Sequence, residues 1–350
     1  MRDYLRLAER ALTWIEEKPA VVVAGAAGAT IGVALVLASS AGWPRVLHLV
    51  YTRHSWLWLA VCFAGELVAY GGYVLTIRDM ARVDDGPELS LAVSTQTVVA
   101  GFGVFAATRS SGGFAVDYWA FRRAGAGKRD AVTRVLGLGF LEYTVLATAA
   151  LVASAALFFR LDGHASNSVT LPSLLVVPSI AAGLWVTSPK RVERLSAPGR
   201  GGWISRSFAN AVAGAATVRS LLASPREHGV GVLGNVVYWG GDILCLWAAL
   251  QLVNAHITVA ALVLAYSGGY VLTRRALPAG GAGLVEIALT LALVGMGVGF
   301  VRALVGVVVY RLFNFWLPIV PALLLMPAIA ELRTRFQRAE RAAGPDTKRR

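Results

Sequence analysis

Residues 277–321 read LPAGGAGLVEIALTLALVGMGVGFVRALVGVVVYRLFNFWLPIVP, and this stretch decides how the rest of the chain is interpreted. It opens with a break rich in Pro and Gly, and Glu286 follows one turn into an apolar segment. A long apolar run then carries Arg311 and Asn314. Ionisable residues inside a membrane are costly, and they mark functional sites when they occur beside broken helices. The stretch therefore indicates both a membrane fold and a site within it.

The composition extends this interpretation to the whole chain. Of its 350 residues, 56% are hydrophobic and 15% are charged, and the mean hydropathy is +0.61. A soluble protein of this size needs more polar surface. The net charge of +13 does not indicate nucleic acid, because Lys and Arg gather in short loops and tails, as in cytoplasmic flanks facing anionic lipid. We expect an all-α, polytopic transmembrane helical bundle of about 8–9 spans.

Runs of roughly 20 apolar residues mark the spans. Residues 1–18 mix acids and bases, so we expect a cytoplasmic N-terminal segment there rather than a signal peptide. One transmembrane domain should cover 19–330, and a basic cytoplasmic tail should cover 331–350. The segment 207–228 is typical of a helix at the membrane surface. The predicted spans are 20–39, 56–76, 90–108, 135–159, 171–186, 230–253, 257–273, 284–300 and 303–329.

The distribution of basic residues predicts the topology. Residues 188–206 carry five basic side chains and one acid, so this loop and the C-terminal tail should face the cytoplasm. The spans of the second half then alternate correctly, but the first half fails by one crossing. A broken or re-entrant element over 112–124 restores the count, provided that it is buried in protein or lines a wet cavity. Both termini are then cytoplasmic.

The same correction reveals a candidate internal repeat. In each half an uncharged span precedes a Gly-Gly break, at 112–113 and at 280–281, and an acid follows. A long span closes each unit, and its buried charge lies 29 residues after the first break and 30 after the second. The halves, about 90–160 and 257–329, would run in opposite directions, as in many secondary transporters. The alternative is coincidence in a chain with 37 glycines.

Five ionisable residues lie well inside the predicted spans: Glu66, Glu142, Asp242, Glu286 and Arg311. Each costs roughly 3 kcal/mol at the centre of a helix in lipid, so they must face the protein interior. Four acids and one base indicate that Arg311 neutralises one acid, while the others are protonated, wet or engaged by a cation. For each residue, a structural ion pair or a protonated acid is the alternative to a transport role. For Glu286, beside the Gly-rich break, we favour function.

Other chemistry is not indicated by the sequence. Cys62 and Cys245 lie in apolar runs without metal or disulfide spacing, so we expect them to pack in the core. The histidines have no paired spacing typical of a zinc site, and no cofactor-binding motif occurs in a credible context. We expect neither a metal nor a cofactor.

Short motifs in the late stretch carry a family resemblance. Residues 278–286 read PAGGAGLVE, and Tyr-Arg-Leu and Trp-Leu-Pro follow at 310–312 and 316–318. These motifs resemble the transmembrane region of the lysylphosphatidylglycerol synthase/flippase family. An earlier family element, a Gly-Gly-Asp-like turn before a basic helix, is similar to the stretch with Asp117 and Arg122. There the chain departs from the pattern, because three residues separate the glycines from the acid and no proline precedes them.

The resemblance covers most of residues 56–329 and implies a polytopic helical membrane protein. Better understood members of the family move aminoacylated phosphatidylglycerol between leaflets, and others are linked to polyprenyl or glycolipid pathways. Bifunctional members carry a soluble synthase domain after the membrane region. This chain ends about twenty residues after its last predicted span, so we do not expect it to be an enzyme of aminoacyl transfer.

We therefore predict a lipid translocase of the cytoplasmic membrane that moves or binds a polar lipid, such as an aminoacyl-phospholipid or a glycolipid. An acidic cavity would suit a cationic headgroup, and Arg311 or Arg122 would suit a phosphate. One alternative is an accessory of a polyprenyl-phosphate or glycolipid glycosyltransferase pathway, with a partner enzyme; another is a scaffold whose interior charges only pack. The expected partners are membrane lipids and not nucleic acid. The predicted lipid-binding residues are Glu66, Asp117, Arg122, Glu142, Gly280, Gly281, Gly283, Glu286, Arg311 and Asn314.

Overall fold

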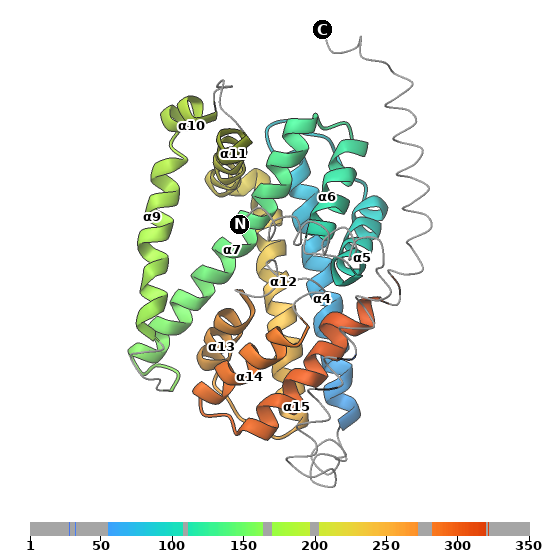
Figure 1. Ribbon diagram of the computed structural model, residues 1–350, viewed down its shortest axis with the longest axis vertical. Coiled ribbons are helices and arrows are strands. Elements are labelled where there is room, and N and C mark those ends of the chain that lie inside the picture. Colours follow the sequence, from blue (N-terminus) through green and yellow to red (C-terminus); the bar gives the residue numbers. More distant parts are fainter. Residues whose placement is uncertain are drawn as a thin grey trace, which may run out of the picture.

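The computed structural model describes residues 28, 32, 55–107, 111–163, 170–196, 203–271, 282–319 and 321. Throughout these ranges the regular structure is helical, without a strand, which confirms the all-α prediction (Figure 1). The segment 1–18, nearly all of the predicted span 20–39, the break at 280–281 and the tail 331–350 lie outside the described residues.

Four helical segments in the described ranges are long and apolar enough to cross a membrane. They are α4 (Ser55–Arg82), α7 (Lys128–Phe158), α12 (Pro225–Leu252) and the run Phe300–Ile319. At about 1.5 Å per residue, even the shortest of them matches roughly 30 Å of hydrocarbon. Each of them overlaps a predicted span, so hydropathy located these helices correctly.

The last of these segments is not a uniform helix. It begins as α15 (Phe300–Arg311), continues through the π-helical turn η3 (Leu312–Trp316), and resumes as α-helix to Ile319. A π-helical turn uses i to i+5 hydrogen bonds and is frequent at functional sites. Here the turn carries the buried Asn314, which becomes part of the site described below.

The centre of the fold is the antiparallel pair α4 and α12. Their backbones touch at two places, Gly65 against Gly241 and Gly72 against Gly234. A Cβ atom at Gly72 would lie 2.4 Å from the carbonyl oxygen of Gly234, so only glycine permits this approach. Small residues allow such close packing between membrane helices, where dispersion contacts rather than hydrophobic burial hold helices together.

Two helical hairpins flank this pair. In the first, α5 (Leu91–Ala107) packs on α6 (Ser111–Arg123); in the second, α13 (Val259–Val271) packs on α14 (Leu284–Gly295). Over their described residues, at 1.5 Å per residue, these helices span about 18–26 Å. Figure 1 shows the two hairpins toward opposite ends of the bundle.

The segment predicted over 112–124 is the second arm of the first hairpin. It returns along α5, as the topology count requires, but it is a continuous helix. Gly112 and Gly113 lie in the first turn of α6, where they begin a helix and do not interrupt one. The sequence predicts a broken or re-entrant element here, and the described helix is continuous from Ser111 to Arg123, since membrane helices tolerate glycine.

A constant separation of 169 positions relates the two halves. It pairs Gly65 with Gly234 and Gly72 with Gly241. Gly65 contacts Gly241, and their partners under this pairing, Gly234 and Gly72, also contact each other. Such reciprocal contacts are expected for a two-fold axis between α4 and α12. Because these corresponding helices are antiparallel, the two halves run in opposite directions. The repeat units therefore also include α4 and α12, which lie before the predicted halves.

The chain between α7 and α12 forms η1 (Leu171–Leu175), α9 (Val176–Val186), α10 (Pro189–Ser196) and α11 (Trp203–Ala223). α11 packs on α7, and Figure 1 shows it almost end-on, across the direction of α4 and α12. This orientation fits the surface helix predicted over 207–228, but the predicted end is wrong. Pro225 has no N–H and a fixed φ, so it begins a new helix, and His228 lies on α12.

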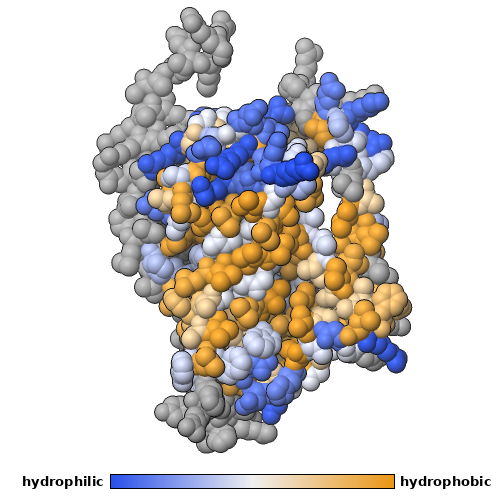
Figure 2. Space-filling view, turned by 180° about the vertical axis from the view of Figure 1, so that it is seen from behind, coloured by the Kyte–Doolittle hydropathy of each residue, from blue (hydrophilic) through white to orange (hydrophobic). Residues whose placement is uncertain are grey.

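Polar and apolar residues separate along the long axis of the molecule. Figure 2 shows a broad apolar surface, with hydrophilic residues gathered at the end that bears α10 and α11 in Figure 1. The last turn of α4, with Arg82, and the start of α7 meet at this end. Arg134 joins them: its Nε donates to Ala81 O at 3.2 Å, and its Nη2 donates to Val83 O at 2.8 Å.

Candidate functional site

A buried ion pair joins α14 to α15. Arg311 Nε donates to Glu286 Oε1 at 2.9 Å, and both side chains are almost completely buried. Glu286 lies in the first turn of α14, where the exposed N–H groups favour an acid. Its other oxygen, Oε2, accepts the N–H of Gly283 at 2.6 Å. Gly283 has a φ of +88°, which L-residues rarely adopt, so this glycine allows the carboxylate to close the helix start.

The π-helical turn connects Arg311 to α12. Arg311 Nη1 donates to Asn314 Oδ1 at 3.4 Å, and Asn314 Nδ2 donates to Asp242 Oδ1 at 2.8 Å. Tyr266 of α13 donates its hydroxyl to the other oxygen, Asp242 Oδ2, at 2.5 Å. The guanidinium carbon also lies 4.3 Å from the centre of the Phe315 ring. Side chains from α12, α13, α15 and η3 thus meet in one polar network.

Glu66 of α4 belongs to the same network, because its carboxyl interacts with that of Asp242. The network contains three acids, and within the described residues Arg311 is the cation that faces Asp242. Arg311 binds Glu286 at 2.9 Å, and the carboxyl groups of Glu66 and Asp242 lie side by side next to this ion pair. We call the following residues the Arg311 cluster: Glu66, Asp242, Tyr266, Glu286, Arg311 and Asn314.

A second buried polar group lies farther along α4. Tyr73 donates its hydroxyl to Asp117 Oδ2 at 3.4 Å, which links α4 to α6. Trp239 Nε1 donates to the main-chain oxygen of Glu142 at 3.0 Å, which places α7 against α12. One turn before Trp239, Asn235 is fully buried, and its amide has no hydrogen-bonding partner within the described ranges. We call Tyr73, Asp117, Glu142 and Asn235 the Asp117 cluster.

Aromatic rings connect the two clusters. The centroids of Tyr73 and Tyr238 are 5.2 Å apart, and those of Tyr238 and Trp239 are 4.7 Å apart. Trp239 in turn lies 5.9 Å from Tyr266, which binds Asp242. Ring pairs at these distances pack favourably. The two clusters are therefore parts of one continuous buried region along α12.

The separation of 169 positions also relates the two clusters. The four pairs are Glu66 and Asn235, Tyr73 and Asp242, Asp117 and Glu286, and Glu142 and Arg311. Glu66 of α4 lies in the Arg311 cluster, and its counterpart Asn235 of α12 lies in the Asp117 cluster. Each cluster thus includes one residue from the other half of the chain, because α4 and α12 pack together at the two-fold axis. The chemistry is not conserved between them: a carboxyl group in the Asp117 cluster corresponds to the guanidinium of the Arg311 cluster.

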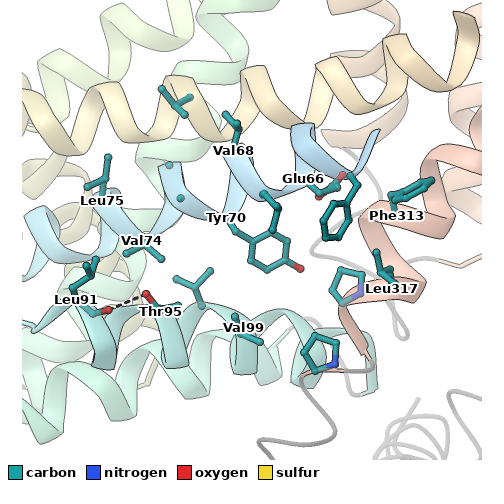
Figure 3. A pocket seen from close by; sticks show the side chains of 18 residues that line it. Glu66, Val68, Tyr70, Val74, Leu75, Leu91, Thr95, Val99, Phe313 and Leu317 are labelled. Carbon is teal, nitrogen blue, oxygen red and sulfur yellow. Dashed lines mark hydrogen bonds between the residues drawn. The ribbon is translucent and has the colours of Figure 1, made fainter. Parts of the chain in front are cut away.

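A groove of about 920 Å³ leads to the Arg311 cluster. It is bounded by α4, α5, α12 and the end of the last helical run, and its lining is apolar except for Glu66, Tyr70 and Thr95. Figure 3 shows Glu66 beside Phe313 at one end, Leu91 toward the other end, and the hydroxyl of Tyr70 pointing into the groove. The volume lies in the range of small-molecule sites. An apolar ligand in the groove would thus meet a buried carboxyl at its inner end.

Of the ten residues predicted to bind lipid, four lie in the Arg311 cluster and two in the Asp117 cluster. Gly283 positions Glu286. Arg122 lies outside both clusters as defined, and its Nη1 donates to Ala126 O at 2.6 Å, in the loop after α6. The last two, Gly280 and Gly281, lie outside the described residues. The lipid-binding role of all ten stays a prediction.

The sequence interpretation includes Asp242 among the buried charges but not in the site, and it omits Tyr73, Asn235 and Tyr266. A signal for three of these four was present. Residues 65–73 read GELVAYGGY, and residues 234–242 read GNVVYWGGD, so that the glycines align at a separation of 169. The two Gly-Gly pairs do not show this separation, because the buried charge lies 29 residues after the first pair and 30 residues after the second.

Comparison with known proteins agrees with the motifs of the late stretch. The family described as the lysylphosphatidylglycerol synthase TM region matches residues 20–322, which is most of the chain. The match includes α4, α12, both hairpins and both clusters. It confirms the resemblance inferred from the Gly-rich break and the Tyr-Arg-Leu and Trp-Leu-Pro elements. No match was found among curated proteins.

Proposed function

Because the chain belongs to the lysylphosphatidylglycerol synthase transmembrane-region family, we propose that it is a translocase for a polar lipid, such as an aminoacyl-phospholipid or a glycolipid. The observation that carries this proposal is the apolar groove of about 920 Å³ that ends on Glu66 and the Arg311 cluster. An amphiphile has the same two parts. Its acyl chain would occupy the groove, and its headgroup would lie against the buried polar network.

The charges of the cluster favour a headgroup that carries a cation. Within the described residues the cluster has three acids, Glu66, Asp242 and Glu286, and one cation, Arg311, so an ammonium group that reached Glu66 at the end of the groove would meet an excess of carboxyl groups. A lipid phosphate would compete with Glu286 for the guanidinium of Arg311, which forms strong paired hydrogen bonds with phosphate oxygens. A zwitterionic headgroup, with an ammonium and a phosphate, would use both parts of the cluster.

The inverted halves support movement between leaflets rather than simple binding. Transporters with such repeats place their site near the midplane and expose it alternately to the two sides. A second cavity, of about 560 Å³, lies between α7, α13 and α14 and is lined by Leu264, Ser267 and Gly268. The corresponding residues of α5, 169 positions earlier, line the first groove: Thr95, Val98 and Val99. Two related cavities suit a lipid that enters on one side and leaves on the other.

We place the protein in the cell membrane, with the end that bears α10 and α11 toward the cytoplasm. This orientation follows from the positive-inside rule, because α10 and the start of α7, which are rich in Lys and Arg, belong to that end. The proposed activity is transport without a chemical step on the lipid. The lipids of this membrane are its partners, and a lipid-modifying enzyme would supply the substrate.

Reconstitution tests the proposal. Liposomes containing the protein and labelled lysyl-phosphatidylglycerol on one leaflet should lose the asymmetry faster than empty liposomes, measured by accessibility of the label. Glu286→Gln should slow this loss, whereas Glu227→Gln, an exposed acid in the first turn of α12, should not. The same assay with phosphatidylglycerol and a polyprenyl-phosphate sugar compares headgroup classes. Movement of every lipid at the rate of empty liposomes would refute the translocase proposal.

A further inference from the structure

Two carboxyl groups meet where α4 and α12 are closest. Gly65 and Gly241 bring the backbones together, since a Cβ at Gly65 would lie 2.8 Å from Gly241 O. The residues that follow these glycines are Glu66 and Asp242, whose carboxyl groups interact. Glu66 is 5% exposed and Asp242 is fully buried. Two acids are thus held together in a place from which water is largely excluded.

Within the described residues, the surroundings of this pair supply hydrogen-bond donors to Asp242 and one cation, Arg311, for three acids. Tyr266 and Asn314 donate to its two oxygens, and Arg311, which faces it, is engaged by Glu286 at 2.9 Å. Two ionised carboxylates in contact repel each other strongly in a medium of low dielectric constant, and each loses its hydration. A single proton on the pair removes one charge and both penalties. In the part of the chain that the structure describes, the titratable and charged groups around the pair are Cys62 of α4, Cys245 of α12, Tyr266 of α13, Glu286 of α14, and Tyr310 and Arg311 of α15.

We propose that Glu66 and Asp242 together bind one proton, and that the ammonium group of a lipid in the groove displaces this proton to the solvent. Glu66 is the member of the pair that lines the groove, so it is the point at which the ligand and the proton meet. The charges balance. With one proton the pair has a charge of minus one; after the proton leaves, two carboxylates and one ammonium again sum to minus one. The exchange thus couples lipid binding to proton release without adding net charge to the buried site.

The pseudo-symmetry of the chain supports a special role for position 66. Its counterpart, 169 positions later, is the amide Asn235, and the counterpart of Asp242 is the phenol Tyr73. At neutral pH the related site therefore has neither carboxyl of the pair, although the helix contact is the same. A carboxyl pair at the contact of α4 with α12 therefore occurs in one of the two related sites. Glu66→Gln makes that site resemble its counterpart and preserves the shape of the side chain.

Proton release on lipid binding tests the coupling, which rests on the proposed function. Purified protein in weakly buffered nanodiscs with a pH indicator should release one proton for each lysyl-phosphatidylglycerol bound, and none with phosphatidylglycerol, which lacks the ammonium. Glu66→Gln should lose the release. Wild-type binding without release, or equal release from Glu66→Gln, would refute the coupling and leave the translocase proposal standing. If neither lipid binds, the proposed function fails. The shared proton is then tested by infrared spectroscopy, which needs no lipid.

Infrared spectroscopy tests the proton without any lipid. The wild-type protein should show the C=O stretching band of a protonated carboxyl group, shifted by exchange into heavy water. The band should lose intensity in Glu66→Gln and in Asp242→Asn, and should be unchanged in Glu227→Gln, which alters an exposed acid. If one variant does not fold, the other still decides. Absence of the band from the wild type, or equal intensity in the folded variants, would overturn the assignment of the proton to this pair.

Discussion

The contact between α4 and α12 can be tested with two adjacent glycines. A Cβ at Gly72 would lie 2.4 Å from Gly234 O and 2.5 Å from the N atom of Tyr238, both of them backbone atoms, whereas a Cβ at Gly71 meets nothing within 4 Å. Gly71→Ala should therefore be neutral or stabilise the helix by up to about 1 kcal/mol. Gly72→Ala forces the helices apart, and overpacking of this kind costs about 1–3 kcal/mol. The two neighbours should thus differ by about 1–4 kcal/mol in the free energy of unfolding.

The measurement is thermal or denaturant unfolding of the purified protein in one detergent. The second half of the chain supplies an independent copy of the experiment. Gly241 would place a Cβ 2.5 Å from Gly65 O, and the adjacent Gly240 meets nothing within 4 Å, so Gly241→Ala and Gly240→Ala should repeat the difference. Equal stability of Gly71→Ala and Gly72→Ala would refute the close contact. A difference in only one of the two halves would refute the two-fold relation between α4 and α12.

Three further predictions concern the ion pair, a helix start and the groove. Arg311→Ala leaves Glu286 buried without its partner and should lower the free energy of unfolding by about 3–5 kcal/mol; a loss comparable to that of an exposed residue would contradict the buried pair. Asp162 Oδ2 accepts the N–H of Ala260 at 2.7 Å at the start of α13, so Asp162→Ala should cost about 0.5–2 kcal/mol and speed amide exchange in that turn; unchanged exchange would contradict the cap. Thr95→Trp fills the groove and should weaken lipid binding at least about tenfold, or about 1.4 kcal/mol, in a binding titration, without unfolding the protein. Val152→Trp, at an exposed position of α7, is the matched control, and equal binding by both would contradict the groove.

Much of the fold could be predicted because a bilayer allows few solutions. A crossing segment must satisfy its own backbone hydrogen bonds, so roughly 20 apolar residues in sequence indicate a helix, and α4, α7 and α12 follow that rule. The arrangement of shorter helices could not be read in the same way. Gly112 and Gly113 are compatible with a break, a turn or a helix start, and only packing on α5 decides among them.

The site could be predicted in part, for a similar reason. The cost of an isolated charge in apolar surroundings indicated that Arg311 had to meet an acid, and Glu286, 25 positions away, is that acid. The remaining partners depend on geometry that local sequence does not specify. Asn314 reaches Asp242, 72 positions away, from a π-helical turn, and hydrophobic periodicity does not reveal such a turn. Tyr266 joins because α13 lies against α12, which is a property of the assembled fold.

The two-fold relation has a consequence for the balance between conformations. If two halves of a protein were identical, a state in which the first half is open and the second closed would have the same energy as its mirror arrangement, and neither would be preferred. Here the two clusters differ at all four related positions, and a carboxyl group at position 142 stands where position 311 has a guanidinium. These side chains therefore lift the degeneracy, although the glycine contacts between α4 and α12 are related by the two-fold axis. If the protein is the translocase proposed above, it should have a preferred resting side, and exchanging residues between the related positions should reverse that preference.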